Sequence, residues 1–473
     1  FLVADGETQD KMLREQPAIA EALRVHLGDA AFAELRADLG QAKPTDLAIA
    51  GPKNVLFVPG VMGSTLISKG LGGVWWLDLM FARDQLDGLA LAADGSDADV
   101  DADIQAGGID VQYGSLRRAI AVSKSFGGSG EFPYDWRKSF ASSAAALRDS
   151  VLARAAETGE KVHLVAHSMG GLMIRSALML HGEAMWPKIG KIVFIGTPHY
   201  GSPAIAGYLK NHLWGFEALA ALGMFLSRAT FRSLRGVLSL LPAPVGVYPG
   251  TRSAGFQPED HPCANFDLYD AAAWKLDDLD ASGLQRLQTV LDEAKRFHED
   301  LFHWHDNLLQ EFKDCMLMIA GVGQAGLFRL EFDTLFWGAW ERTKKQTDRI
   351  EGRVDYDGDG RVPLASAQLE DVETRYVRGV HGGLTGIPAV MTDVLAWLEG
   401  GTLQLPTSAQ GALSAHLGSD DGASTTPLLD GSAEPDLYRS LPAYEKPTDE
   451  FKQAIARRLD AGQMPEVNRA RLL

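Results

Sequence analysis

The chain has 473 residues, 46% of them hydrophobic, so it is long enough to bury one large core and carry sizeable insertions. Its formal net charge of -17 excludes a nucleic-acid partner, because phosphate binding depends on clustered Lys and Arg. Two cysteines, Cys263 and Cys315, exclude a disulfide scaffold and a cysteine-rich zinc module, although one bridge between them stays open.

No helix-compatible apolar run reaches the roughly 18 residues that a membrane-spanning helix needs, so we expect a soluble protein and favour the cytoplasm. The acidic residues that follow Phe1 are unlike a signal peptide. Because the chain begins with Phe1 rather than Met, we expect its true start to be missing, and secretion stays open.

The first half of the chain alternates between apolar strands and helices. Helical spacing predicts two short helices between 17 and 40, within an N-terminal extension of residues 1–50. The elements predicted after it are a strand at 55–58, the Gly-rich loop 59–65, a helix at 140–158, a strand at 162–166, a helix at 172–180 and a strand at 192–195. This order predicts an α/β fold with a mostly parallel central sheet, whose first part spans 51–203.

Residues 204–314 fit no further sheet repeat, and we expect them to form a helical cap over the active edge of the sheet, with one helix at 284–294. The core should resume over 315–401 with strands at 316–322 and 375–380 and a closing helix at 387–399. Residues 402–473 turn rich in Ser, Thr, Gly and Pro, which predicts a linker-like tail ending in a short helix after Thr448.

Residues 166–171, Ala-His-Ser-Met-Gly-Gly, lie between a predicted strand and a predicted helix, as a nucleophile elbow requires. Small residues at 166 and 170 suit its tight, strained turn. The alternative is a chance string of this type, which the flanking strand and helix disfavour. Ser168 is therefore the predicted nucleophile.

A serine hydroxyl needs a general base, and the chain has twelve histidines to choose from. In this fold the base follows the final strand, which favours His381, with Gly382 and Gly383 leaving room beside it. His167 would point away from the elbow and is interpreted as structural. His163 lies inside a strand and is interpreted as packed.

The acid is expected in the stretch 355–363, Asp-Tyr-Asp-Gly-Asp-Gly-Arg-Val-Pro, with Asp359 preferred and Asp357 as the alternative. The same stretch resembles the opening of an EF-hand loop, but Ser366 replaces the twelfth-position Glu and Pro363 interrupts the loop. A calcium site is therefore disfavoured, and we expect no cofactor.

A metal site is also considered where histidines crowd the cap region, at His298, His303, His305 and Asp306. On a helix His303 and His305 would face different sides, and no zinc spacing such as His-x-x-x-His occurs among the four residues, so a surface or packing role is preferred. We therefore expect no metal.

Hydrolysis also needs donors for the oxyanion, usually two backbone N–H groups. Met169 follows the nucleophile, and Val61 takes the equivalent place in loop 59–65. That loop lacks the Gly-Lys-Ser/Thr ending of a phosphate cradle.

These motifs resemble the lecithin:cholesterol acyltransferase-like family of α/β-hydrolases. The matching stretches are Pro59–Ser64, the Pro-Tyr-Asp-Trp-Arg string at 133–137, the elbow, Gly-Thr-Pro-His-Tyr-Gly-Ser-Pro at 196–203, residues 357–363 and 381–383. The resemblance covers about residues 51–400. It implies a triad of Ser168, Asp359 and His381, and an oxyanion hole of Val61 and Met169. It also implies that the cap holds the acyl-binding surface, for which the candidates are Trp214, Phe216 and Phe225.

The expected function is hydrolysis of carboxylic esters of apolar, lipid-like substrates through an acyl-enzyme. Acyl transfer to an alcohol is the alternative, because the chemistry is shared up to that intermediate. A non-catalytic binding protein on a hydrolase scaffold is a third possibility. The aromatic cap residues would sooner form a buried core than a patch for transient contact with a lipid surface.

Overall fold

The computed structural model describes residues 6–18, 20, 21, 24, 32, 51–71, 74–76, 86–110, 113–209, 227–257, 260–263, 266–324, 326–332, 350–355 and 357–415. Its first helix is α1 (Gly6–Glu15), which the sequence does not predict. The two helices predicted between 17 and 40 lie largely outside the described residues.

The central sheet has six strands in the order β11-β8-β7-β6-β1-β5. Every pair of neighbours in it is parallel. Its strands are β1 (Val55–Val58), β5 (Ser129–Glu131), β6 (Val162–His167), β7 (Ile189–Ile195), β8 (Met316–Val322) and β11 (Glu373–Arg378). The apolar runs of β1, β6, β7 and β8 are mostly buried, as expected for parallel strands covered on both faces.

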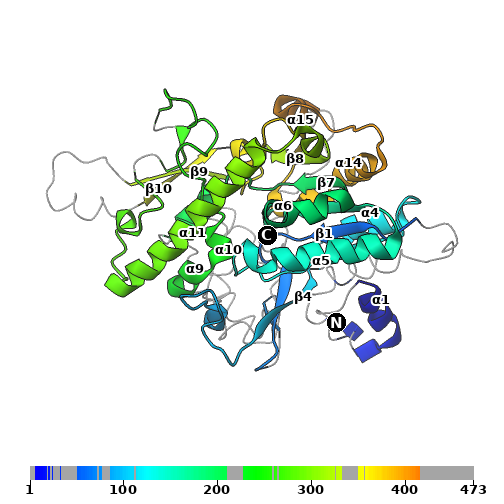
Figure 1. Cartoon of the computed structure of the whole chain (residues 1–473), viewed down its shortest axis with the longest axis horizontal. Coiled ribbons are helices and arrows are strands. Elements are labelled where there is room, and N and C mark those ends of the chain that lie inside the picture. The colour runs from blue at the N-terminus through cyan, green and yellow to red at the C-terminus, as the bar shows by residue number, and fades with distance from the viewer. Residues whose placement is uncertain are drawn as a thin grey trace, which may run out of the picture.

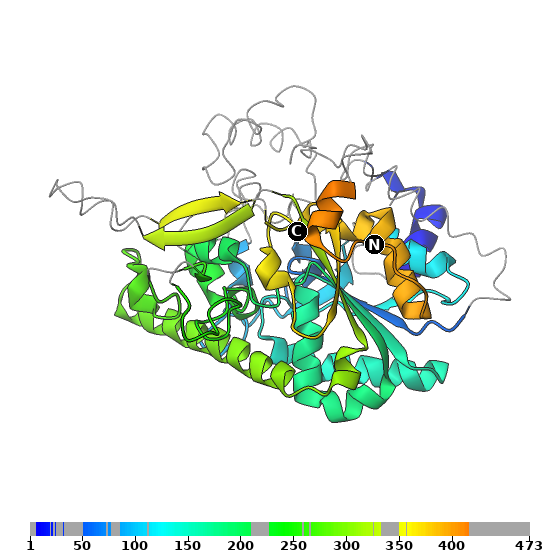
Figure 2. The ribbon, with the colours of Figure 1, turned by 90° about the horizontal axis from the view of Figure 1, so that it is seen from above.

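Two layers of helices cover the sheet, and the alternation of side chains along each strand decides which layer a residue contacts. Leu56 and Val58 share one apolar cluster with α5 (Phe140–Thr158) and α6 (Met169–Met185). Val55 and Phe57 point to the other face and share a second cluster with α4 (Gly114–Val122) and α14 (Pro388–Glu399). Figure 2 shows α14 in orange on one side of the sheet and the teal helices on the other.

The predicted strands and helices of this core are confirmed. Helix α5 has the predicted bounds and ends at Gly159, whose φ of 72° is the left-handed conformation that glycine favours at a helix end. Helix α6 is longer than predicted, because its first turn begins directly after Ser168. Strand β7 lies between η4 (Trp186–Lys188), which precedes it, and α7 (Pro203–Leu209), which follows it.

A second, antiparallel sheet lies beside the core and was not predicted. Its strands are β2 (Ser64–Ser68), β3 (Val74–Trp76) and β4 (Ile104–Ile109), in the order β3-β2-β4, with η2 (Leu86–Leu89) between the last two in sequence. Strand β2 begins within the Gly-rich loop after β1, so this sheet continues from the loop of the predicted oxyanion hole.

The described part of 204–314 is helical or irregular, and its role as a cap over the active edge stays a prediction. Beyond α7 it contains α9 (Arg228–Ser233), α10 (Arg235–Leu238), η6 (Ala271–Trp274), α11 (Ala281–Asp306) and α12 (Gln310–Lys313). Helix α11 has 26 residues, begins at an Asp280 side chain that accepts from Gly283 N, and crosses the lower part of the molecule in Figure 2. Arg235 pairs with Glu293 and so joins α10 to α11.

Between β8 and β11 the chain makes an unpredicted antiparallel ribbon of β9 (Gly326–Phe332) and β10 (Ile350–Asp355). Figure 2 shows it in yellow, projecting beside the main sheet. The short helices η7 (Leu364–Ala367) and η8 (His381–Gly386) flank β11.

The first part of the predicted tail packs against the core. Residues 402–408 run along the edge strand β11, where Tyr376 N donates to Pro406 O at 3.0 Å. The Asp393 carboxylate accepts from Gln404 N and Leu405 N, at 2.8 and 2.9 Å. Helix α15 (Ala409–Ala415) follows and covers part of β8 and β11 (Figure 1), and the helix predicted after Thr448 lies outside the described residues.

The structure also bears on the two cysteines and on membrane-spanning helices. Cys263 and Cys315 are both free thiols, so they do not form the bridge left open above. None of the helices that the structure describes combines the length and hydropathy that crossing a bilayer requires.

Candidate active site

Ser168 occupies a strained turn between β6 and α6. Its φ of 52° and ψ of -128° are values that side-chain-bearing residues rarely adopt. The turn is fixed by the bond from Ser168 N to Ile195 O, 2.8 Å long. At Gly170 a Cβ atom would lie 2.4 Å from Val58 O, so the glycine lets the elbow approach β1. The strand–turn–helix context predicted for Ser168 is therefore present.

His381 lies beside the serine. It begins η8, shortly after β11 ends at Arg378. Its Nε2 is 2.8 Å from Ser168 Oγ, although the two residues are 213 positions apart in sequence. Both are buried, with 3% of Ser168 and 4% of His381 exposed.

Asp359 contacts the other ring nitrogen of His381. Its Oδ2 is 2.7 Å from His381 Nδ1, and its Oδ1 accepts from Arg361 N at 3.0 Å and Val362 N at 2.8 Å. A carboxylate can only accept, so His381 Nδ1 carries the proton and Nε2 is left to accept from the serine hydroxyl. Asp357, the alternative acid, is exposed.

Asp359 lies where the chain comes back to the end of β8 after the β9–β10 ribbon. After β8 the chain leaves the sheet through β9 and β10, and Asp359 then bridges to Gln324, just beyond the end of β8. His381 N also donates to Asp359 O at 2.9 Å. The carboxylate therefore lies at the carboxyl end of β8 in space, although a whole ribbon separates the two in sequence.

The two predicted oxyanion donors lie on adjoining turns. Met169 is the first residue of α6, and Val61 lies in the turn after β1. A Cβ at Gly60 would be 2.9 Å from Ser168 Cβ, so the Gly-rich loop and the elbow are in contact. Among the residues that the structure describes, neither the Val61 nor the Met169 amide has a hydrogen-bond acceptor. A backbone N–H at a helix start suits an oxyanion.

The remaining candidate histidines have other partners. His167 is buried and its Nε2 donates to His381 O at 3.0 Å, while burial lowers its pKa to about 3. His163 of β6 accepts through Nδ1 from Lys191 N of the neighbouring strand β7, at 3.0 Å. Both side chains are thus held by backbone groups, and it is His381 whose ring lies beside Ser168 Oγ.

The four candidate ligands on α11 differ in exposure, and the two buried histidines both lie near Arg175. His298 and His305 are buried, and burial lowers the pKa of each to about 4, whereas His303 and Asp306 are exposed. In the described ranges no three His, Cys, Asp or Glu side chains are grouped as a metal site would need. Trp214, Phe216 and Phe225, the predicted acyl-binding residues, lie outside the described residues.

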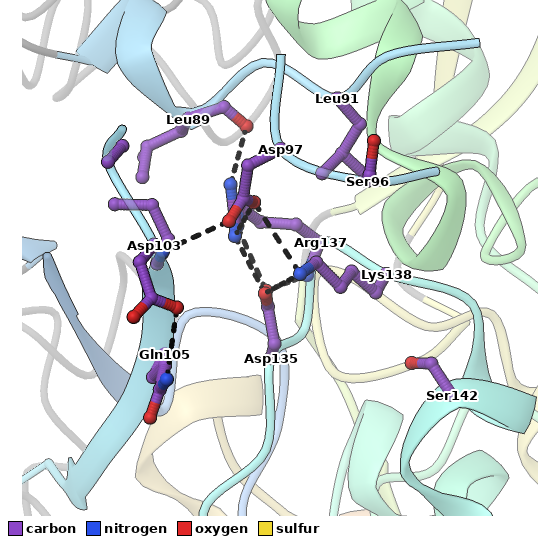
Figure 3. A network of polar contacts seen from close by, with 12 residues as sticks. Leu89, Leu91, Ser96, Asp97, Asp103, Gln105, Asp135, Arg137, Lys138 and Ser142 are labelled. Atoms are coloured by element: carbon purple, nitrogen blue, oxygen red, sulfur yellow. Dashed lines mark hydrogen bonds and ion pairs between the residues drawn. The ribbon is translucent and has the colours of Figure 1, made fainter. Parts of the chain in front are cut away.

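The Pro-Tyr-Asp-Trp-Arg string joins the loop after β1 to the cap region. Trp136 Nε1 donates to Ser64 O at 3.2 Å, at the start of β2. The fully buried Arg137 lies between Asp135 and Asp97, as Figure 3 shows. Burial alone would lower the pKa of Arg137, but the bonds and charges of Asp135 and Asp97 raise it above its ordinary value. This motif is therefore structural: its backbone carbonyl at Arg137 also accepts from Gly236 N of α10, at 2.9 Å.

Tyr113 is a residue of the site that sequence reasoning missed. Its hydroxyl lies 3.1 Å from His167 Nδ1 and accepts from Gly60 N at 3.2 Å. No motif surrounds it, and 54 positions separate it from His167.

Comparison with known proteins shows what part of the chain is similar to. Residues 130–261 match the family model of lecithin:cholesterol acyltransferase, a range that includes the Pro-Tyr-Asp-Trp-Arg string, the elbow and the stretch 196–203. A curated relative, phospholipase A(1) LCAT3 of Arabidopsis thaliana, is 25% identical over 275 residues, which are 51% of this chain and 58% of that protein. The matched part thus spans little more than half of the relative.

Solved structures of similar shape include a chain of the Tle4–Tli4 complex, with a TM-score of 0.45 and 16% identity over 74% of this chain and 97% of that one. The mature lipase BlEst2 of Bacillus licheniformis has a TM-score of 0.33 and 16% identity, over 73% and 89%. The parallel sheet, its strand order and the helices on both faces are those of an α/β-hydrolase. The resemblance that the motifs indicate is confirmed: residues 130–261 are similar to the lecithin:cholesterol acyltransferase family, and the chain has the α/β-hydrolase fold.

Proposed function

We propose that the chain is a serine hydrolase that cleaves carboxylic esters of apolar, lipid-like substrates. The observation that supports this most strongly is the pair of short contacts from Ser168 Oγ to His381 Nε2 and from His381 Nδ1 to Asp359 Oδ2, 2.8 and 2.7 Å long. A serine, an imidazole and a carboxylate in this order make up the triad of serine hydrolases.

In this proposal Ser168 Oγ attacks the acyl carbonyl carbon while His381 Nε2 takes the hydroxyl proton. Asp359 keeps the imidazole in the tautomer that can accept, and stabilises the cation that forms. The N–H groups of Val61 and Met169 donate to the oxyanion of the tetrahedral intermediate. His381 then returns the proton to the leaving alcohol, and water resolves the acyl-enzyme by the same steps in reverse.

The class of substrate is inferred from relatives. The curated relative is named a phospholipase A(1), which supports a phospholipid or similar lipid ester. The acyl-binding role of Trp214, Phe216 and Phe225 stays a prediction. Transfer of the acyl group to an alcohol is the second candidate, supported by the matching family model, whose description is an acyltransferase.

The test compares the wild type with Ser168→Ala on p-nitrophenyl esters of increasing chain length and on phosphatidylcholine vesicles. We expect Ser168→Ala to lose at least about 10³-fold in kcat, since loss of a triad nucleophile removes the attacking group itself. Ser176→Ala is the matched control, because Ser176 is an equally buried serine further along α6. Undiminished turnover by Ser168→Ala would refute the proposal.

Two additions separate the alternatives. A fluorophosphonate should label the wild type and not Ser168→Ala, whereas an unlabelled wild type would favour a non-catalytic binding protein. Adding a long-chain alcohol and measuring new ester against free acid separates transfer from hydrolysis.

A further inference from the structure

A buried chain of hydrogen bonds connects the Gly-rich loop to His381. Gly60 N lies 3.2 Å from Tyr113 Oη, Tyr113 Oη lies 3.1 Å from His167 Nδ1, and His167 Nε2 lies 3.0 Å from His381 O. The side chains of Tyr113 and His167 are both 0% exposed, so water does not compete for these contacts.

Each bond in this chain has a fixed direction. The carbonyl of His381 can only accept, so His167 Nε2 carries a proton. Burial lowers the pKa of His167 to about 3, so the ring is neutral at ordinary pH and its Nδ1 must accept. Tyr113 therefore donates its hydroxyl proton to His167, which leaves the phenolic oxygen to accept from Gly60 N.

The Gly-rich loop packs closely against the Tyr113 hydroxyl and the His167 ring. A Cβ at Gly63 would lie 2.8 Å from Tyr113 Oη, and one at Gly60 would lie 3.3 Å from His167 Nδ1. The Tyr113 ring packs on Phe57 of β1 at 4.8 Å between centroids. The loop therefore folds around the hydroxyl, and its two glycines allow that approach.

The loop also holds a strained residue. Met62, next to Val61, has a φ of 62°, which an unbranched side chain tolerates only when neighbouring contacts hold it. Gly63 N donates to Gly60 O at 3.1 Å and closes this turn, and the Gly60 amide is anchored on Tyr113. Without the tyrosine hydroxyl, one end of the strained turn would lose its anchor.

We propose that Tyr113 and His167 are positioning residues, which together fix the spacing between the Val61 amide and the His381 imidazole. The inference rests on the proposed function, since it concerns the same reaction. Neither side chain touches the reacting atoms in this scheme: Tyr113 acts through the loop, and His167 acts through the backbone of His381. Preorganised donors favour the transition state more than the bound substrate, so the effect should fall on kcat.

The first test is Tyr113→Phe, which removes one oxygen and keeps the ring packed on Phe57. We expect kcat on a p-nitrophenyl ester to fall roughly 10- to 100-fold with KM within about threefold, because the donor is displaced and not removed. Inhibition by an alkyl boronic acid, whose adduct places a negative oxygen at the oxyanion position, should weaken by a similar factor. Tyr134→Phe is the matched control, because Tyr134 is 3% exposed and its hydroxyl has no partner among the described residues.

The second test is His167→Asn, which removes the bond to His381 O, combined with Tyr113→Phe. Because Tyr113 and His167 belong to one series of hydrogen bonds, the double variant should lose about as much kcat as the worse single variant. Losses that multiply would overturn the inference. Wild-type kcat and boronate affinity in Tyr113→Phe, beside an inactive Ser168→Ala, would overturn it alone. Full activity in Ser168→Ala would overturn the proposed function and this inference together.

Discussion

Replacing Asp359 by Asn tests whether the carboxylate sets the tautomer of His381. Oδ1 of Asp359 accepts from two backbone N–H groups, Arg361 N at 3.0 Å and Val362 N at 2.8 Å. A side-chain NH₂ group cannot occupy that place, because it would face two donors. The amide nitrogen of the introduced asparagine would have to take the position of Oδ2, 2.7 Å from His381 Nδ1.

The consequence is a histidine of the wrong tautomer. With an N–H donor facing it, His381 Nδ1 must accept, so the proton moves to Nε2 and the ring no longer takes a proton from Ser168. We expect kcat to fall on the order of 10⁴-fold with little change in KM, the loss known for this exchange in a protease with a Ser-His-Asp triad. At about 1.4 kcal/mol per decade this is roughly 5 kcal/mol of transition-state stabilisation.

The assay is steady-state hydrolysis of a p-nitrophenyl ester, with thermal unfolding to show that Asp359→Asn is folded. Asp357→Asn is the control, because Asp357 is exposed and two positions away. A loss below about tenfold in Asp359→Asn would refute the tautomer argument. A large loss in Asp357→Asn alone would assign the acid to the other residue.

Three further predictions concern stability. Arg137→Met should lower the free energy of unfolding in urea by about 3–5 kcal/mol, because the fully buried guanidinium that separates Asp97 from Asp135 is lost (Figure 3). Ser168→Gly should raise thermal stability by about 1 kcal/mol while abolishing turnover, because glycine tolerates a φ of 52° and a ψ of -128°. Burial lowers the pKa of His298 from 6.5 to about 4, so the neutral ring favours the folded state fully above pH 6.5. As the pH falls from 6.5 through 4, the free energy of unfolding should decrease by up to about 3 kcal/mol. Urea titrations at a series of pH values measure this decrease.

Each of the three stability predictions has a result that would contradict it. Arg137→Met with an unchanged urea midpoint would mean that water reaches the two carboxylates. A less stable Ser168→Gly would show that the elbow is not strained. For His298, the comparison is His298→Asn, whose stability should depend less on pH between 6.5 and 4 than that of the wild type.

The sequence predicted the parts of the fold that are encoded locally. Strands β1 and β8 are uninterrupted apolar runs, β6 and β7 each contain a shorter one, and α5 has apolar residues at helical spacing with a terminal glycine, so each could be read from a short window. The second sheet could not, because β4 contains two glycines and only half of its residues are buried. The β9–β10 ribbon was missed because its strands, GLFRLEF and IEGRVD, mix charged with apolar residues and so lack the apolar run of a buried strand.

The site was predictable where a residue's role follows from its place on an element. Ser168 follows a strand, and His381 follows the last strand, so the fold alone brings them to one edge of the sheet. The choice between Asp359 and Asp357 depended on the course of a loop, because both follow β10 and are two positions apart. Tyr113 had no signal at all, since its importance comes from contacts made across 53 and 54 positions of sequence.

The two strained residues of the site lie on adjoining turns, and this explains why both motifs are rich in glycine. Met62 follows β1 and Ser168 follows β6, which are neighbouring parallel strands, so their turns meet at one edge of the sheet. A Cβ at Gly170 would lie 2.5 Å from Pro59 O, so only glycine lets the two turns touch backbone to backbone. We infer that this contact supports each turn in its strained form and keeps the Val61 and Met169 amides near each other. The strain and the proposed oxyanion hole therefore have one physical origin, the close packing of these two turns.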